Sequence, residues 1–425
     1  MKQMRLFFSK LLSLKQGEFR LLALSFGFIF VLFSSYALLR PMRDALGLEG
    51  GKDELKWLFL ATFVSCIIAS LVLMWLSTRI RRRFYTDFVF VFFALNLIGF
   101  FVAMNAFETK SVEFVWLARA FYVWVSIFNL FAFSSAWSLI ADIFSKEASQ
   151  RLFGIIAAGA SLGSIAGASS VKIFANLIGA SNLVFASVVL LLLGVMLKNL
   201  MIKELGKLEN GVNLERFDKT IGAKNPFVGF TLIAKSPYLL ALCAFVLLLT
   251  SVSTFLYMEQ ARIVREAFAT REARMAAFAN IDLVVQISAL IIQIFLTAKI
   301  AQFFKLTALL GVLGFVICAG FVVLIFTHPA FLPLAVVMSV RRVGEYALVK
   351  PGREMLFVPL SSDEKYKVKS FIDTVIYRGG DALWAQFESL LASVSITLVL
   401  GVGAFVSFVW GLLGVFLGKR YEKTT

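Results

Sequence analysis

Residues 21–39 read LLALSFGFIFVLFSSYALL, a run of nineteen residues without a charged side chain. A helix of this length and composition crosses ~30 Å of hydrocarbon, the core of a bilayer. Five basic residues precede the run, as in a signal peptide, but the apolar stretch is too long and lacks a small-residue cleavage site. We therefore predict a retained first transmembrane helix.

The composition extends this interpretation to the whole chain. Its 425 residues are 60% hydrophobic and 16% charged, and the mean hydropathy is +0.87. Soluble domains average about 25% charged residues, so a water-soluble globule is excluded. Transmembrane β-barrels need alternating segments of ~10 residues, which the sequence lacks. The expected fold class is all-α, a polytopic membrane protein.

Further apolar runs predict about twelve transmembrane helices in two six-helix halves. After the first run they fall near 57–77, 85–107, 112–143, 153–177, 182–201, 237–261, 276–298, 306–327, 331–356, 370–391 and 397–417. The longest polar stretch, 203–235, lies near the middle of the chain. We expect an N-terminal bundle over 1–202, a cytoplasmic linker over 203–235 and a C-terminal bundle over 236–425.

A short repeat supports the two halves. Arg40-Pro41-Met42-Arg43-Asp44-Ala45-Leu46 closes the first span, and Arg262-Ile263-Val264-Arg265-Glu266-Ala267-Phe268 closes the seventh. Both arginines keep the same offset of 222 residues between the halves. Similar chemistry at two helix ends is the alternative explanation for this pattern.

Basic residues crowd the loops on one predicted side of the membrane and account for the net charge of +16. They include the N-terminal segment, the Arg79–Arg83 loop, the 203–235 linker and the Lys419-Arg420 tail. Lys and Arg concentrate in cytoplasmic loops, so both termini are expected in the cytoplasm. The topology in the membrane then explains the net positive charge, and we expect no nucleic-acid partner.

The tenth span carries charges where a membrane helix can least accommodate them. Arg341, Arg342 and Glu345 lie near mid-depth, with Lys350 and Arg353 further on. A buried salt bridge between helices is one explanation. We favour a cavity lining, because one glutamate cannot neutralise two adjacent arginines.

Other predicted spans carry ionisable groups at comparable positions. The candidate substrate-binding residues are Arg40, Arg43, Arg119, Glu259, Arg341, Arg342 and Arg353, and the candidate coupling residues are Glu259, Asp282 and Asp44. The planar guanidinium fork binds carboxylates and phosphates in a bidentate manner, so the set predicts an anionic solute. Snorkelling to the interface is the alternative for the arginines at helix ends.

Enzymatic chemistry finds little support in the sequence. Gly159-Ala160-Ser161-Leu162-Gly163 has the form of a nucleophile motif, but no strand precedes it and His328 is the single histidine. Gly159, Gly163 and Gly167 instead predict a seam for close helix packing. There is no P-loop, and the three cysteines lack metal-site spacing. We predict no enzyme activity, no cofactor and no metal.

Four stretches resemble one transporter family. They are Tyr36–Leu46, Trp137–Asp142 with Arg151–Gly154, Pro351–Leu360 and Lys367–Asp373. The sequence resembles the ATP/ADP nucleotide translocases of plastids and intracellular bacteria, a distant major facilitator branch, and above all their free-living bacterial relatives. The resemblance implies a major facilitator-like fold in a bacterial inner membrane and an antiporter that exchanges nucleotides. It also implies functional charges at Arg43, Glu259 and Arg353.

The leading hypothesis is a secondary active transporter, proton-coupled or exchanging, that moves an anionic and phosphorylated or nucleotide-like solute by alternating access. A flippase for an anionic lipid or lipid-linked precursor is the main alternative, since it would use the same fold. A membrane-embedded sensor without transport is disfavoured by the charges within the spans. The expected partners are the small anionic solute and membrane lipids, and the protein is expected to be a monomer.

Overall fold

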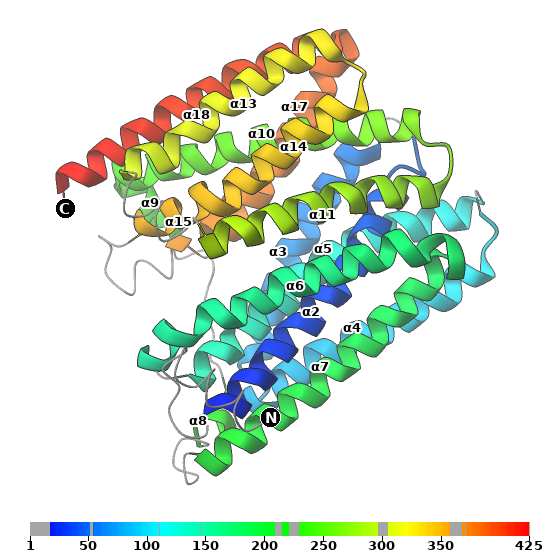
Figure 1. Ribbon diagram of the computed structural model, residues 1–425, viewed down its shortest axis with the longest axis vertical. Helices are drawn as coiled ribbons and strands as arrows, with labels where there is room; N and C mark the ends of the chain where they lie inside the picture. Colours follow the sequence, from blue (N-terminus) through cyan, green and yellow to red (C-terminus); the bar gives the residue numbers. More distant parts are fainter. Residues whose placement is uncertain are drawn as a thin grey trace. The chain divides into compact units, whose positions relative to one another are not determined.

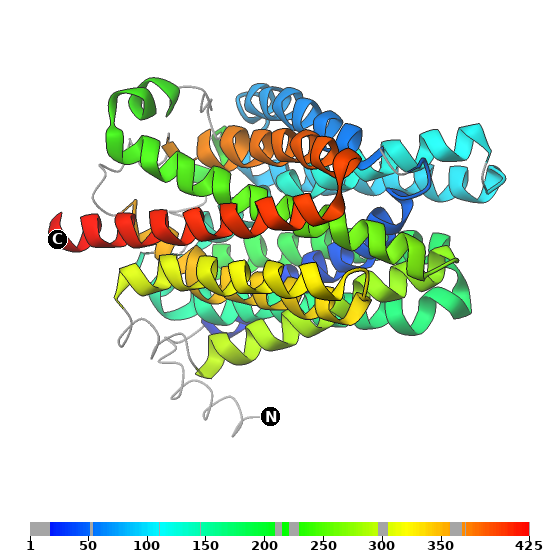
Figure 2. The same ribbon diagram turned by 90° about the horizontal axis from the view of Figure 1, so that it is seen from above.

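The computed structural model of the protein describes residues 18–424 except 52–53, 110, 145, 209–214, 221–228, 296–304, 358–367 and 370. Regular secondary structure in these residues is helical, and an isolated antiparallel bridge joins Arg81 to Thr220. The chain divides into two compact units. Unit 1 comprises Met1–Arg43 and Val72–Ala223, and unit 2 comprises Asp44–Leu71 and Lys224–Thr425. The long helices of each unit lie side by side as a bundle (Figures 1 and 2).

Six long helices account for most of the first half of the chain. They are α2 (Glu18–Leu46), α3 (Glu54–Ser77), α4 (Arg82–Ala106), α5 (Val112–Ile143), α6 (Lys146–Ile178) and α7 (Ala180–Leu208). The short helix α8 (Glu215–Asp218) follows. The first part of α3, up to Leu71, groups with unit 2.

The second half begins with the short helix α9 (Gly229–Lys235). It continues with α10 (Pro237–Ala267), α11 (Arg271–Phe295), α13 (Leu306–Thr327), α14 (Phe331–Gly344), α15 (Lys350–Met355), α17 (Tyr377–Val394) and α18 (Ile396–Thr424). Two π-helical turns, η2 (Glu345–Val349) and η3 (Ile372–Ile376), stand before α15 and α17.

The all-α membrane architecture predicted from the sequence is confirmed. Within the described residues, ten helices are long and apolar enough to cross a membrane: α2 to α7, α10, α11, α13 and α18. The two other predicted spans, 331–356 and 370–391, consist of shorter helical pieces that include η2 and η3. Residues 1–17 and much of the predicted linker lie outside the described residues, and the division at 203–235 stays a prediction.

Local sequence explains where several helices begin. The hydroxyl of Ser111 accepts a hydrogen bond of 3.1 Å from the Phe114 N–H and caps α5. Ser236 caps α10 in the same way through the Leu239 N–H, and Pro237 occupies the first turn. Serine is favoured at N-caps, and proline at the first helical position lacks an N–H that would be unpaired there.

The predicted glycine seam is confirmed in unit 1. Cβ atoms added to Gly159, Gly163 and Gly167 would lie 2.8, 2.3 and 2.5 Å from backbone carbonyl oxygens of α2. The Ser34 hydroxyl also donates to the Gly163 carbonyl at 3.0 Å. Helices α2 and α6 therefore approach closely because these positions lack side chains, as small-residue motifs allow in membranes.

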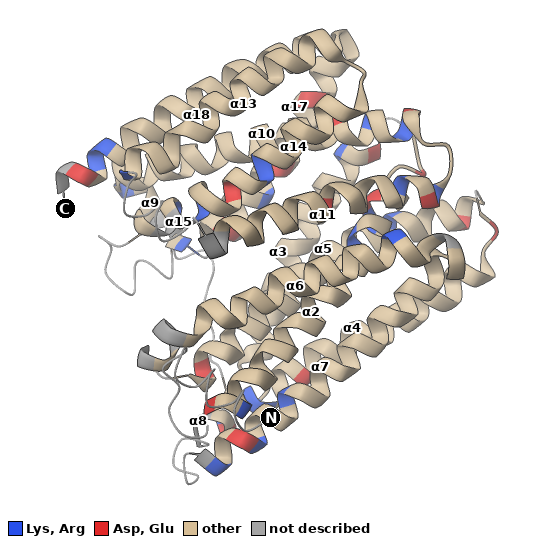
Figure 3. Ribbon diagram, viewed as in Figure 1, with Lys and Arg blue, Asp and Glu red and all other residues tan. Residues whose placement is uncertain are grey.

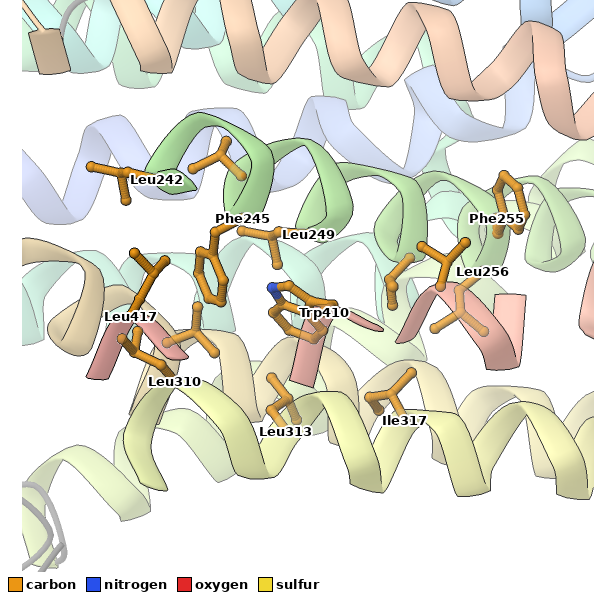
Figure 4. Packing of buried hydrophobic residues seen from close by; sticks show 14 of the residues in the cluster. Leu242, Phe245, Leu249, Phe255, Leu256, Leu310, Leu313, Ile317, Trp410 and Leu417 are labelled. Atoms are coloured by element: carbon orange, nitrogen blue, oxygen red, sulfur yellow. The ribbon is translucent and has the colours of Figure 1, made fainter. Parts of the chain in front are cut away.

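Unit 2 has a similar close pair in α13 and α18, where Gly314 and Gly411 meet. Beside this pair the buried indole of Trp410 packs on Phe245 of α10, with ring centroids 5.7 Å apart (Figure 4). Lipid tails are as apolar as these side chains, so shape complementarity rather than hydrophobic transfer holds such helices together.

Candidate functional site

Charged side chains occur part-way along the helices of unit 2 as well as at their ends (Figure 3). Arg341 and Arg342 on α14 are only 5% and 4% exposed. Arg341 lies ten residues into a helical segment that begins at Phe331, or about 15 Å along its axis, near half the thickness of the hydrocarbon core. Charges at this depth need partners or a wet cavity.

Each of the two arginines has its own carboxylate. Nη1 of Arg341 donates to Oε2 of Glu345 at 2.9 Å, one turn along the same helix. Arg342 donates to Oδ1 of Asp282 on α11. The sequence argument left one arginine of this pair without a counter-ion, and Asp282 supplies it. The four residues of these two pairs therefore form one buried cluster without net charge.

Two π-helical turns flank this cluster. Glu345 is the first residue of η2, and its carbonyl accepts the Lys350 N–H five residues on. Asp373 lies in η3, and its Oδ1 is 3.2 Å from Nη2 of Arg353. Single π-helical turns inside α-helices occur frequently at functional sites. Arg353 thus has a carboxylate partner of its own.

Glu259 belongs to a second buried cluster in unit 2. Arg262 donates to Oε2 of Glu259 through Nη1, and to Oε1 of Glu388 on α17 through Nη2 at 2.8 Å. The carboxylates of Glu259 and Glu388 are 1% and 0% exposed. Nε2 of His328, at the end of α13, lies 2.7 Å from the second oxygen of Glu259. One guanidinium therefore serves two buried carboxylates.

Asp44 lies where α2 passes into unit 2. Its Oδ1 accepts a 2.9 Å hydrogen bond from the Tyr257 hydroxyl of α10, and the residue is 3% exposed. Nearby, Arg271 at the start of α11 lies 3.2 Å from Glu49. These contacts attach the Asp44–Leu71 segment to the helices of unit 2.

In unit 1 the predicted arginines contact aromatic rings. The Arg43 guanidinium stands 5.0 Å from the centre of the Tyr122 ring and 3.4 Å from the Ser126 hydroxyl, both on α5. Arg119 stacks on Trp116 of its own helix at 4.5 Å. Arg40, one turn before Arg43 on α2, is half-buried.

Three functional candidates were missed by the sequence analysis. Glu388, His328 and Tyr257 complete the clusters around Glu259 and Asp44. Each is far in sequence from its partner, so periodicity within one helix could not have found it. Among the described residues no group of three or more His, Cys, Asp and Glu side chains is placed to hold a metal ion.

Comparison with known proteins identifies the family. The sequence profile described as Major Facilitator Superfamily matches residues 8–349. The chain belongs to the major facilitator superfamily. Members are transporters and not enzymes, so this chain is a secondary transporter with many membrane-spanning helices. A search of curated proteins finds no match.

Several solved structures share the superfamily fold. A mutant of the peptide transporter POT in complex with alafosfalin has 15% identity and a TM-score of 0.67, with 95% of each chain covered. A POT family transporter in complex with 5-aminolevulinic acid has 11% identity and a TM-score of 0.67, covering 94% of this chain and 96% of its own. The POT structure with sulfate has 15% identity and a TM-score of 0.66, with 95% of each chain covered.

These findings correct the predicted family. The resemblance to ATP/ADP nucleotide translocases is wrong: the matching profile is that of the major facilitator superfamily, and the similar structures are peptide transporters. Nucleotide exchange rested on that resemblance alone and is withdrawn with it.

Proposed function

We propose that this major facilitator transporter carries a small anionic solute by alternating access and couples its movement to protons. We place it in a bacterial inner membrane, as a monomer with both termini in the cytoplasm. The crowding of Lys and Arg in the Arg79–Arg83 loop and in the Lys419-Arg420 tail supports this orientation.

The observation that carries the proposal is the buried pair Arg341 and Arg342. An arginine at mid-membrane is costly, and a chain that needed only stability could replace the ion pairs with apolar side chains at little loss. The carboxylates of Glu345 and Asp282 hold the two guanidinium groups. An anionic solute that takes the place of either carboxylate would find a preformed bidentate donor.

Unit 1 offers a second set of donors for the same class of solute. Arg43 is held between the Tyr122 ring and the Ser126 hydroxyl, and Arg40 and Arg119 lie on the same two helices, α2 and α5. We assign these arginines to anion recognition in the first half of the chain. The POT structure with sulfate holds an anion on this fold, which supports the choice of charge class.

Coupling requires a carboxylate whose charge changes during the cycle. We propose Glu259, Asp282 and Asp44 as candidates, since each is a buried acid with a partner that can be released. Protonation of Asp282 would free Arg342 for the solute, and protonation of Glu259 would leave Arg262 to Glu388 alone. Both changes increase the positive charge that is available to an anion.

The test is a thermal-shift panel on purified protein. The panel contains small mono- and dicarboxylates, 5-aminolevulinic acid, dipeptides, sulfate, neutral sugars and anionic phospholipids. A bound solute stabilises by about 2.7 kcal/mol at a hundredfold excess over its Kd. We expect stabilisation by at least one water-soluble anion. Stabilisation by anionic phospholipid alone would favour the flippase instead.

The site is tested with a charge-neutral double variant, Arg341→Gln with Glu345→Gln, which avoids an unpaired buried charge. It should weaken binding of the active anion roughly 10–150-fold, the value of a lost charge-assisted hydrogen bond of ~1.5–3 kcal/mol. The matched control replaces another ion pair, in unit 1, in which the lysine is buried. Nζ of Lys198 lies 2.5 Å from Asp87, and Lys198→Met with Asp87→Asn should leave anion binding unchanged. Equal binding by both double variants would refute the assignment.

A further inference from the structure

Asp381 is a buried carboxylate that neither the anion site nor the cluster around Arg262 uses. It lies on α17, thirteen residues before the end of the helix, and is 8% exposed. This places it about 20 Å along the helix axis from Val394, well inside the bilayer core. Its Oδ1 accepts a 3.3 Å hydrogen bond from the Thr254 hydroxyl of α10.

The cation nearest to this carboxylate is too far away for a hydrogen bond. Nη1 of Arg378 lies 3.8 Å from Oδ2 of Asp381, beyond the usual 2.7–3.2 Å of an N–H···O bond. By contrast, Glu345 and Glu388 accept from arginines at 2.9 and 2.8 Å. Asp381 is therefore held by a neutral hydroxyl, whereas Glu345 and Glu388 are held by guanidinium groups in direct contact.

Close helix packing encloses the carboxyl group. A Cβ added to Gly380 would lie 2.4 Å from the Thr250 hydroxyl of α10, and one added to Gly379 would lie 3.2 Å from Phe63 of α3. The Asp381 side chain nevertheless retains 12% of its accessible surface. The group is thus largely shielded and keeps a small accessible surface.

The surrounding charges come from each helix that packs near it. Charged side chains that act on Asp381 electrostatically are Arg378 on its own helix, Arg341 on α14 and Glu345 in η2. From α3 the thiol of Cys66 is close enough to interact with Asp381, and η3 contributes Asp373. The charged residues of α10 all lie beyond Thr254, at Glu259, Arg262, Arg265 and Glu266, and α18 carries its charges only near its end.

We propose that Asp381 is a proton-binding site. Burial disfavours the ionised form of a carboxyl group, and a single hydroxyl donor compensates for it far less than a contacting guanidinium does. A proton taken from water would attach to Oδ2 and change the charge of the group from −1 to 0. The Thr254 hydroxyl can remain bonded to Oδ1 in both states.

The role of this site in transport rests on the proposed function. Protonation of Asp381 removes the nearest negative charge from Arg378 and raises the local charge by one. Arg378 then becomes an additional attraction for an anionic solute. Binding of a proton and binding of an anion therefore favour each other, as symport requires.

The experiment is an infrared pH titration of the purified full-length protein without any added solute. The probe is the proton itself, followed by the C=O stretch of a protonated carboxylic acid. We expect a titrating band in the wild type that is lost in Asp381→Asn. The band should persist in Asp142→Asn, a control in unit 1 whose carboxylate pairs directly with Arg82 at 3.3 Å. A band that survives in Asp381→Asn, or disappears only in Asp142→Asn, overturns the proposal.

A second variant decides the matter if Asp381→Asn does not fold. Thr254→Val removes the hydroxyl that stabilises the ionised form, so the midpoint of the band should move upward by about 0.5–1 pH unit. An unchanged midpoint would contradict the assignment. These measurements use no transported solute. If no anion in the thermal-shift panel stabilised the protein, the proposed substrate class would be wrong, but the proposed proton site would be unaffected.

Discussion

Replacing Arg262 by glutamine should destabilise the protein more than other single arginine changes in α10. The guanidinium donates to both Glu259 and Glu388, which are 1% and 0% exposed. Each charge-assisted bond contributes ~1.5–3 kcal/mol, and breaking a buried ion pair from one side costs ~3–5 kcal/mol because a charge remains unpaired. We expect a loss of about 3–5 kcal/mol.

The measurement is thermal unfolding in detergent, followed by size-exclusion chromatography after heating. At about 2–4 °C per kcal/mol for a unit of this size, the midpoint should fall by roughly 6–20 °C. Arg265→Gln is the matched control. It lies three residues further on the same helix, and among the described residues it has no ion pair with a carboxylate. Its midpoint should change by only a few degrees.

A compensating variant separates lost charge pairing from lost packing. The triple change Arg262→Gln, Glu259→Gln and Glu388→Gln leaves no unpaired charge, so it should recover most of the stability. If Arg262→Gln alone unfolds at the wild-type temperature, the two glutamates are not held by this guanidinium and the reasoning fails. If the triple variant is no better than the single one, the arginine stabilises through packing and not through charge.

Two further predictions concern packing. Gly163→Ala should cost about 1–3 kcal/mol in thermal unfolding, because its Cβ would meet the backbone of Phe30; Gly154→Ala on the same helix, with nothing within 4 Å, should be neutral or stabilising. Trp410→Ala should cost roughly 3 kcal/mol, at the lower end of the usual range, because lipid removes much of the transfer contribution. Trp410→Phe should cost far less, since the buried indole N–H has no partner among the described residues. Equal stability of both glycine variants, or of both tryptophan variants, would contradict these explanations.

The sequence was informative wherever the signal lay within one helix. The pair Arg341 and Glu345, and the pair Glu259 and Arg262, are three or four residues apart, so helical periodicity alone placed each pair on one face. The glycine seam could be predicted equally well, because a repeat of small residues in a membrane helix allows close contact with another helix. The family assignment from short motifs was wrong, because the matching profile is that of the major facilitator superfamily.

Partners far apart along the chain could not be read from the sequence. Asp282 meets Arg342 across 60 residues, and Glu388 meets Arg262 across 126. Which two helices lie side by side depends on shape and on polar contacts that only form when the bundle packs. The π-helical turns were also not predicted. A one-residue insertion in the hydrogen-bond ladder of a helix leaves no mark in amino-acid composition.

The amino-acid sequence by itself determined that this chain crosses a membrane as a helical bundle. Nineteen uncharged residues in a row can satisfy their backbone polar groups in lipid only as a helix, whatever their neighbours are. Tertiary structure decided how the charges inside that bundle are neutralised. Asp381 illustrates the difference. Its place within an apolar segment follows from the sequence, but only packing against α10 makes a hydroxyl, and not a guanidinium, its hydrogen-bond donor. Depth in the membrane is a property of one segment, whereas the partner of a buried charge is a property of two.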